Sequence, residues 1–239
     1  MKFLLTAINA KFIHSNPAIY SLRASVGEKL QPYVELAEFT INESLESILE
    51  GIWKRQPKVI GFSCYIWNWK LIREILTELP KILPNTEIWL GGPEVTYDGP
   101  GLLSEFPQIT GIMVGEGEVT FREVLDQYVR EAESTGQSEQ QPKPDSIEQQ
   151  AADRTGTVTG KTVAERFGQI PGLCLASGYT ALRELTDLTT IPFLYEDMEP
   201  FTNRIIYYET SRGCPYRCSY CLSSIDKKVR LRDIDVVKK

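Results

Sequence analysis

The sequence has few of the motifs by which enzymes are commonly classified. Among its 239 residues there is one histidine, His14, and there is no phosphate-binding P-loop, no GxSxG nucleophile elbow and no HExxH zinc motif. No apolar run approaches the roughly 20 residues that a membrane span requires. The net charge of −6 does not favour a nucleic-acid partner, because tight phosphate binding usually needs a basic domain. We therefore expect neither a membrane nor a nucleic acid as partner.

Cysteine is also scarce, and its distribution is uneven. The count of five is odd, and the cysteines are not spread along the chain as in a disulfide framework. The opening MKFLLTAINAKF has no small-residue cleavage site, so it is interpreted as a first strand rather than as a signal peptide. We expect the reducing cytoplasm, where clustered cysteines usually serve metal or redox chemistry.

Residues 1–133 alternate regularly between buried-strand and amphipathic-helix patterns. Strands are predicted over residues 2–8, 34–41, 58–65, 86–92 and 109–115. Helices are predicted over residues 17–30, 44–55, 67–79, 100–106 and 119–132. Five such units predict an α/β fold with a five-stranded parallel, Rossmann-like sheet in the flavodoxin-like order 2-1-3-4-5. Ligands of such sheets bind outside the carboxyl ends of the strands, so we expect a site at the loops 9–16, 63–67, 91–97 and 115–118.

The remainder of the chain divides into three parts. Residues 134–168 are rich in Gln, Ser, Thr, Gly and Pro, which predicts a disordered insertion, with a Gln-rich recognition segment as the alternative. Residues 169–203 predict a hairpin around Ser177-Gly178, followed by an irregular connector. Residues 204–239 predict a strand, RIIYYETS (204–211), then a cysteine-containing loop and the start of a helix. Because the chain would stop inside that helix, we expect an N-terminal fragment of a longer protein.

Three of the five cysteines lie within eight residues of the stretch ETSRGCPYRCSYCLSS, as Cys214, Cys218 and Cys221. A closed structural zinc site needs four ligands, and the only histidine lies about 200 residues earlier. A 4Fe–4S cluster held by three thiolates would leave one iron open to a non-protein ligand. Gly213 permits a tight turn before the motif and Pro215 stiffens it. The pattern favours an iron–sulfur cluster, with zinc or ordinary thiols as alternatives.

The segment SRGCPYRCSYC resembles the signature of the radical S-adenosylmethionine (SAM) superfamily, including the aromatic Tyr220 before the last cysteine. The resemblance implies that Cys214, Cys218 and Cys221 bind a 4Fe–4S cluster, that SAM chelates the open iron, and that Tyr220 lines the adenine side. It also implies reductive cleavage of SAM to a 5′-deoxyadenosyl radical, an electron donor such as flavodoxin or ferredoxin, and a small-molecule or peptide substrate. Most of the family's partial (β/α) barrel would lie beyond Lys239, so this chain alone is not expected to turn over SAM.

Residues 1–133 resemble the cobalamin-binding domain that precedes many radical SAM barrels. The stretches that carry this resemblance, GFSCYIWNW, LGGPEVTYD and MVGEGEVTF, follow the third, fourth and fifth predicted strands. Glycine in these loops permits positive φ and close backbone approach to a flat ligand. The implied cobalamin-binding residues are Ser63, Tyr65, Gly91, Gly92, Pro93, Glu94, Gly115, Glu116 and Gly117, together with His14.

His14 lies in the loop where cobalamin domains carry the cobalt-ligating motif Asp-x-His-x-x-Gly. This sequence has Phe12 and Pro17 at the Asp and Gly positions. We therefore expect His14 to touch or hydrogen-bond the ligand rather than to ligate cobalt. Related radical SAM proteins of this layout hold cobalamin without a protein imidazole, so the resemblance still implies cobalamin binding.

Other candidate residues near this edge have simpler interpretations. Cys64 is predicted to be a core residue, and Trp67 and Trp69 are predicted to pack rather than to cover a corrin. Loop glutamates such as Glu94 and Glu116 are expected to be solvated or capping rather than general acids or bases.

The function predicted from these observations is that of a radical SAM enzyme, with cobalamin-assisted methylation of an unactivated carbon as the leading reaction. A non-catalytic module that binds cobalamin or another small ligand is the alternative from a different class, and a zinc-stapled interaction protein is a third. An RNA methylthiotransferase is less favoured. Those proteins carry three further cysteines in the N-terminal domain, whereas Cys64 is the only cysteine before residue 134 here.

Overall fold

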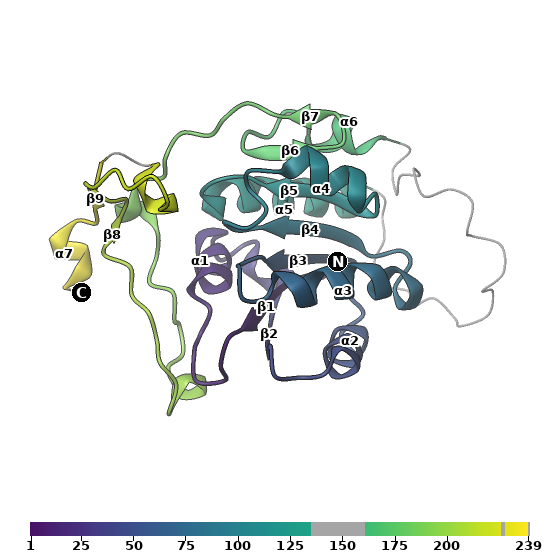
Figure 1. Cartoon of the computed structure of the whole chain (residues 1–239), viewed down its shortest axis with the longest axis horizontal. Coiled ribbons are helices and arrows are strands. Elements are labelled where there is room, and N and C mark those ends of the chain that lie inside the picture. The colour runs from purple at the N-terminus through teal and green to yellow at the C-terminus, as the bar shows by residue number, and fades with distance from the viewer. Residues whose placement is uncertain (135–160, 226–227, 239) are drawn as a thin grey trace.

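The computed structural model describes residues 1–134, 161–225 and 228–238, which form an α/β domain followed by an extended C-terminal segment (Figure 1). Five neighbouring strands of the sheet are parallel and follow the order β2-β1-β3-β4-β5, so the predicted flavodoxin-like order is confirmed. Their bounds are β1 Phe3–Asn9, β2 Val34–Thr40, β3 Val59–Ser63, β4 Glu87–Gly91 and β5 Ile109–Met113.

Helices cover both faces of the sheet, and the alternation of β1 side chains shows how. Phe3 and Leu5 pack in one cluster with residues of α1 and α5, whereas Leu4 and Ile8 pack in another with residues of α2, α3 and α4. Successive side chains of a strand point to opposite faces, so a strand buried on both sides must be apolar throughout. The helices are α1 Pro17–Ser25, α2 Leu45–Trp53, α3 Trp69–Ile82, α4 Gly99–Glu105 and α5 Gly117–Ser134.

Two predicted helix ends were wrong, each for a local reason. Helix α1 stops at Ser25 rather than near residue 30, because Gly27 adopts a left-handed φ of +78° just beyond its end. Helix α3 continues past Pro80 to Ile82. A proline removes one N–H from the helical ladder, and here the Gln108 side chain donates to the carbonyl oxygen of Leu76 at 2.8 Å in its place.

The predicted hairpin is present, and it also extends the sheet. Strand β6 (Leu173–Leu175) pairs with β7 (Gly178–Tyr179) across a short turn. Strand β6 also pairs antiparallel with β5, with Met113 opposite Leu173, which gives a seven-stranded sheet. The hairpin thereby covers an edge of β5 that would otherwise carry unpaired backbone groups.

The predicted disordered insertion over residues 134–168 is wrong at both ends. Ser134 is the last residue of α5, and Val163–Phe167 form helix α6. Thr162 and Glu165 form a capping box on α6. The fully buried Phe167 ring packs edge-on against Trp89 with ring centroids 5.1 Å apart. Phe167, a single large aromatic residue, thus anchors α6 at the end of a polar part of the sequence. Residues 135–160, where the rest of this prediction falls, lie outside the described residues.

The predicted strand 204–211 is not formed over most of its length. Its regular pairing in the described part of the chain is limited to one parallel bridge between His14 and Ile205 and to its last residue, Ser211. A strand needs a neighbour along its length to complete its hydrogen bonds. Only Ser211–Arg212 (β8) pairs further on, antiparallel to Arg230–Leu231 (β9). Short helix α7 (Ile234–Val237) follows. The remaining helical elements are 3-10 turns at Gln31–Tyr33, Leu188–Thr190, Glu199–Phe201 and Leu222–Ser224.

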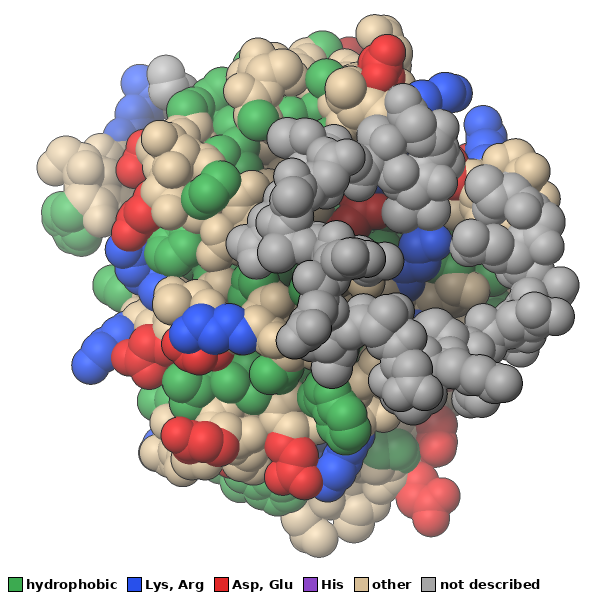
Figure 2. All heavy atoms as spheres, turned by 90° about the vertical axis from the view of Figure 1, so that its right-hand side faces the viewer, with side chains coloured by type: hydrophobic (Ala, Val, Ile, Leu, Met, Phe, Trp, Pro, Cys, Tyr) green, Lys and Arg blue, Asp and Glu red, His purple; other side chains and the backbone are tan. Residues whose placement is uncertain are grey.

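Figure 2 shows the side of the molecule turned away from β8 and β9. Acidic and basic side chains are interleaved over its visible part rather than gathered into a patch of one sign. No helix among the described residues is both long enough and apolar enough to span a bilayer.

Candidate cobalamin-binding site

A cavity of about 950 Å³ opens at the carboxyl edge of the parallel strands. One side is formed by the loops after β3, β4 and β5 and by the start of α1. The other side is formed by residues 207–212 and by Leu222 and Ile225. We call this space the edge cavity. The edge cavity lies where an open parallel sheet binds its ligands. The C-terminal segment therefore reaches the predicted site.

Most of the predicted cobalamin-binding residues line the edge cavity. Those that do are Ser63, Tyr65, Gly91, Gly92, Pro93, Gly115, Glu116 and Gly117. Glu94, His14, Tyr220 and the three clustered cysteines are not among the lining residues. The structure therefore brings the four loop glycines together with Ser63, Tyr65, Pro93 and Glu116 at one cavity.

Backbone rather than side chain forms part of the wall. Gly115 has a φ of +79°, and a Cβ atom there would meet nothing within 4 Å. Gly92 has a φ of +111°, and a Cβ atom there would lie 2.5 Å from the Cys64 carbonyl oxygen. Position 92 requires glycine because the loops after β3 and β4 approach each other closely there. At Gly115, by contrast, the absent side chain leaves the backbone of the cavity wall uncovered. Such bare backbone lets a large flat ligand come close.

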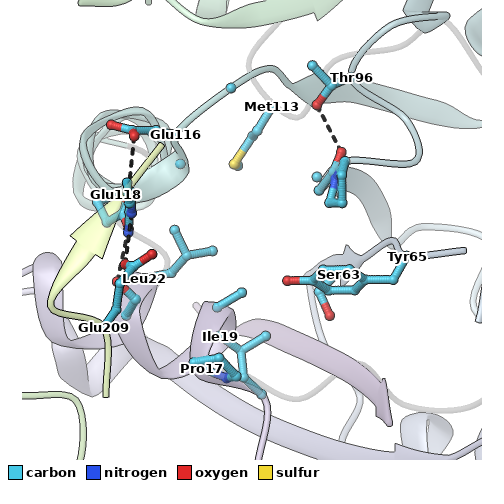
Figure 3. Close-up of a pocket in the computed structure, with 18 of the residues that line it drawn as sticks. Pro17, Ile19, Leu22, Ser63, Tyr65, Thr96, Met113, Glu116, Glu118 and Glu209 are labelled. Atoms are coloured by element: carbon cyan, nitrogen blue, oxygen red, sulfur yellow. Dashed lines mark hydrogen bonds and ion pairs between the residues drawn. The ribbon is translucent and has the colours of Figure 1, made fainter. Parts of the chain in front are cut away.

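The apolar part of the wall comes from the sheet and from α1. Figure 3 shows the sulfur of Met113 directed into the cavity from β5, with Ile19 and Leu22 reaching it from α1. Ser63 and Tyr65 lie across from them at the end of β3. A mainly apolar concave surface with few polar groups is typical of a cofactor site.

Asn68 holds the loop after β3 in place, and sequence reasoning missed it. Its amide nitrogen donates to the carbonyl oxygens of Ile8 at 3.0 Å and Ser63 at 2.9 Å. Its Oδ1 accepts from the Tyr65 N–H at 2.8 Å. Asn68 is fully buried, so it ties the ends of two neighbouring strands together and fixes the position of Ser63 and Tyr65. The available signal in the sequence was an Asn at the start of a predicted helix, where such side chains commonly hydrogen-bond backbone groups.

Glu116 and Glu118 are engaged in ion pairs rather than solvated. Glu118 accepts from Ser21 at 3.0 Å and from Arg212 at 2.5 Å. Glu116 accepts from the Thr186 N–H at 2.7 Å and pairs with Arg230. Burial raises the pKa of Glu116, but the Arg230 and Thr186 hydrogen bonds and the nearby arginine charges outweigh it and bring the pKa below its usual value. Glu116 is therefore held as a carboxylate.

His14 does not reach the edge cavity. Its ring stacks on Tyr207 with centroids 5.9 Å apart, and its Nδ1 hydrogen-bonds the Tyr207 hydroxyl. The expected contact of His14 with a ligand is therefore not supported by this arrangement, and neither is a cobalt–histidine bond.

Cys64, Trp67 and Trp69 largely match their predicted roles. Cys64 is fully buried and belongs to the core, as predicted. Trp69 packs against the same core cluster. Trp67 stacks on Tyr65 with centroids 4.4 Å apart, but it remains nearly half exposed.

The clustered cysteines Cys214, Cys218 and Cys221 are half-buried, and none is in a disulfide. Within the described residues, no three Cys, His, Asp or Glu side chains gather closely enough to hold a metal ion. Gly213 adopts the left-handed φ of +93° predicted for the turn before the motif. Tyr220 is almost fully exposed. The assignment of these residues to a cluster and to SAM stays a prediction.

Comparison with known families bears on the N-terminal domain. The family model of the B12 binding domain matches residues 4–125. The chain belongs to the B12 binding domain family. The match runs from β1 into α5 and so includes every loop that lines the sheet side of the edge cavity.

Curated proteins that are similar to this chain include methyltransferases. The cobalamin-dependent radical SAM methyltransferase TokK of Streptomyces tokunonensis is 28% identical over 183 residues, which is 70% of this chain and 22% of that protein. The 2-(S-pantetheinyl)-carbapenam-3-carboxylate methyltransferase of Streptantibioticus cattleyicolor is 28% identical over 75% of this chain and 24% of its own length. The chain thus spans about a quarter of these two relatives.

Among solved structures, the cobalamin-dependent S-adenosylmethionine radical enzyme OxsB with aqua-cobalamin and S-adenosylmethionine bound matches with a TM-score of 0.65. The match covers 98% of this chain and 30% of OxsB at 18% identity. Over the region that the two proteins share, this chain therefore has the same fold as OxsB. The predicted resemblance to radical SAM proteins with an N-terminal cobalamin domain is confirmed.

Proposed function

We propose that this chain is the cobalamin-binding part, with the start of the radical SAM part, of a cobalamin-dependent radical SAM methyltransferase. The observation that carries the proposal is the edge cavity. It lies at the ligand edge of a B12 binding domain, and the segment that leads into the cysteine motif forms its opposite wall. The names of the relatives supply the reaction class.

The residues of the edge cavity fit a corrin. The open backbone at Gly115 and the glycines Gly91, Gly92 and Gly117 allow a broad, flat group to approach. The apolar side chains of Ile19, Leu22 and Met113 would cover such a group and exclude water. When bound, cobalamin would supply a methyl group for transfer. The protein's part is to bind and orient it.

The corrin would be held here without a protein ligand on cobalt. His14 is the only histidine, and its ring is stacked on Tyr207 outside the cavity. Binding would therefore rest on shape, apolar contact and backbone hydrogen bonds from the strand-end loops.

Cys214, Cys218 and Cys221 would hold the 4Fe–4S cluster, and Tyr220 would lie near SAM. The donor set fits a cluster with one open iron, since it offers three thiolates on one loop. The thiols are not gathered in the described structure, so we derive no reaction step through them. A flavodoxin- or ferredoxin-like electron donor, a small-molecule or peptide substrate and a cytoplasmic location complete the proposal.

The test is anaerobic purification of the protein followed by quantification of iron, cobalt and zinc, together with a titration of the apoprotein with hydroxocobalamin. The proposal expects about one cobalamin per chain and about four irons after reconstitution with iron and sulfide. Cobalamin binding without iron would reduce the proposal to a binding module. Stoichiometric zinc without iron or cobalt would overturn it.

A further inference from the structure

The stretch Gly115–Glu118, here called the GEGE loop, runs into the first turn of α5 and contacts two different parts of the structure. Gly115 and Gly117 line the edge cavity. The side chains of Glu116 and Glu118 bind Arg212 and Arg230. These arginines lie on β8 and β9, and the described residues 213–225 follow β8. We call residues 213–225 the cysteine loop because they contain Cys214, Cys218 and Cys221. The GEGE loop therefore touches both the cavity and the base of the cysteine loop.

The two arginines lie directly opposite each other in the β8–β9 pair. Like charges at directly opposed positions destabilise an antiparallel pair. Glu116 offsets this repulsion, because its Oε1 lies 3.4 Å from Arg212 Nη1 and the same carboxylate also pairs with Arg230. Glu116 therefore bridges the two opposed positive charges.

Each arginine has further partners that fix it to the domain. Arg212 Nη2 donates to Glu118 at 2.5 Å, and its Nε donates to Glu209 at 2.8 Å. Arg230 Nη1 donates to the Thr186 carbonyl oxygen at 2.7 Å. The side chains of both arginines are only about a fifth exposed, so these contacts are screened by solvent less than surface pairs are.

We propose that Glu116 and Glu118 are positioning residues that close the base of the cysteine loop and attach it to the wall of the edge cavity. Through them, occupation of the cavity and the position of the cysteine loop are coupled. The positioning role stands on the contacts alone, whereas the coupling rests on the proposed function, because it takes cobalamin as the occupant.

The positioning role is tested by hydrogen–deuterium exchange of peptides covering residues 213–225 in the ligand-free chain. Glu116→Gln keeps the size of the side chain and removes its charge. We expect it to speed exchange about tenfold, because the opposed arginines then repel. The double variant E116Q/R230M removes one of those arginines and should exchange more slowly than E116Q alone. Added salt should also reduce the effect of E116Q.

Glu123→Gln is the matched control. Glu123 lies on α5, the helix that begins directly after Glu116, and pairs with Arg183. The other printed partners of the Arg183 side chain are Thr120 and Pro171. E123Q is expected to leave exchange of residues 213–225 unchanged. Strictly additive effects of E116Q and R230M, or an E116Q protein that exchanges as the wild type does, would overturn the positioning role.

The coupling is tested by repeating the exchange with methylcobalamin in the dark. We expect methylcobalamin to slow exchange of residues 213–225 several-fold in the wild type and in E123Q, and to slow it far less in E116Q. R230M is expected to weaken the slowing in the same way as E116Q. It is a second test because Arg230, unlike Glu116, does not line the edge cavity. Methylcobalamin that binds without slowing exchange would overturn the coupling and leave the proposed function intact. Absence of binding would overturn both, while the ligand-free comparison would still judge the positioning role.

Discussion

The carbonyl oxygen of Cys64 lies 2.5 Å from the position that a Cβ atom on Gly92 would occupy. The loop after β3 and the loop after β4 therefore approach too closely to admit a side chain at position 92. Both loops line the edge cavity, so the shape of the cavity depends on this contact.

Gly92→Ala should destabilise the protein strongly. The left-handed φ of +111° and the clash with the Cys64 backbone both oppose a side chain, and together they cost about 2–5 kcal/mol. Urea unfolding measures the change. Gly115→Ala is the control, since it faces open space at φ +79° and should cost only about 1–2 kcal/mol. Equal losses in the two variants would contradict the role of the loop contact.

Arg166→Met should also be severely destabilising. Arg166 is buried and pairs with Glu87 and Glu131, both at 2.9 Å. Its removal would take the Arg166 cation away from two largely buried carboxylates, at a cost of about 3–5 kcal/mol. Arg130→Met removes an exposed pair from α5 and should change the free energy of unfolding by less than about 1 kcal/mol. Similar unfolding midpoints for both variants would contradict the stabilising role given to the ion pairs of Arg166 with Glu87 and Glu131.

Glu116 should make the stability depend on pH. Its pKa is lower in the folded protein than in the unfolded chain, so its contribution is present above the unfolded value of about 4.3 and is lost as pH falls through the lower folded value. The difference in unfolding free energy between wild type and E116Q should therefore be largest near pH 6 and shrink toward pH 3. Urea unfolding across this range measures it. A difference that stays constant would contradict the prediction.

The five cysteines should separate into two reactivity classes. Burial raises the pKa of the Cys64 and Cys174 thiols, which lowers their thiolate fraction and blocks access. Cys214, Cys218 and Cys221 are only half-buried. Iodoacetamide at pH 8 should modify three thiols in the native apoprotein and five after unfolding, as counted by mass spectrometry. Early modification of Cys64 would show that the β3 loop opens readily.

His14→Ala should leave the spectrum of bound cobalamin unchanged, because the imidazole is stacked on Tyr207 outside the cavity. Electron paramagnetic resonance of the cob(II)alamin form checks this, since a histidine nitrogen on cobalt would split the lines. Ser63→Trp fills the cavity wall and should weaken binding at least about tenfold, or 1.4 kcal/mol, which shows that the assay responds. Loss of nitrogen splitting in H14A would assign His14 to cobalt.

The order of the parallel strands was predictable because it follows from local patterns. Strands buried on both faces, such as β1, have apolar residues throughout, and the helices between them have an apolar stripe. The loop glycines at the carboxyl edge could be placed for the same reason, since the topology fixes which strand ends meet.

What could not be predicted depends on contacts between distant residues. Glu118 and Arg212 are 94 residues apart, and Glu116 and Arg230 are 114 apart. No local pattern links such partners, so the glutamates seemed solvated. Helix α6 was missed because its place depends on Phe167 meeting Trp89. The strand 204–211 was over-predicted because its residues favour a strand, whereas the described chain offers regular pairing only at Ile205 and Ser211.

The two ends of helix α5 lie far apart. Its 18 residues span about 27 Å, from Gly117 at the edge cavity to Ser134, and α6 returns near that far end, where Arg166 meets Glu131. A fluorescent reporter spliced in between Ser134 and Lys161 would therefore be attached at the opposite end of the helix from the cofactor edge. Such a fusion is expected to report on the protein without perturbing what it binds.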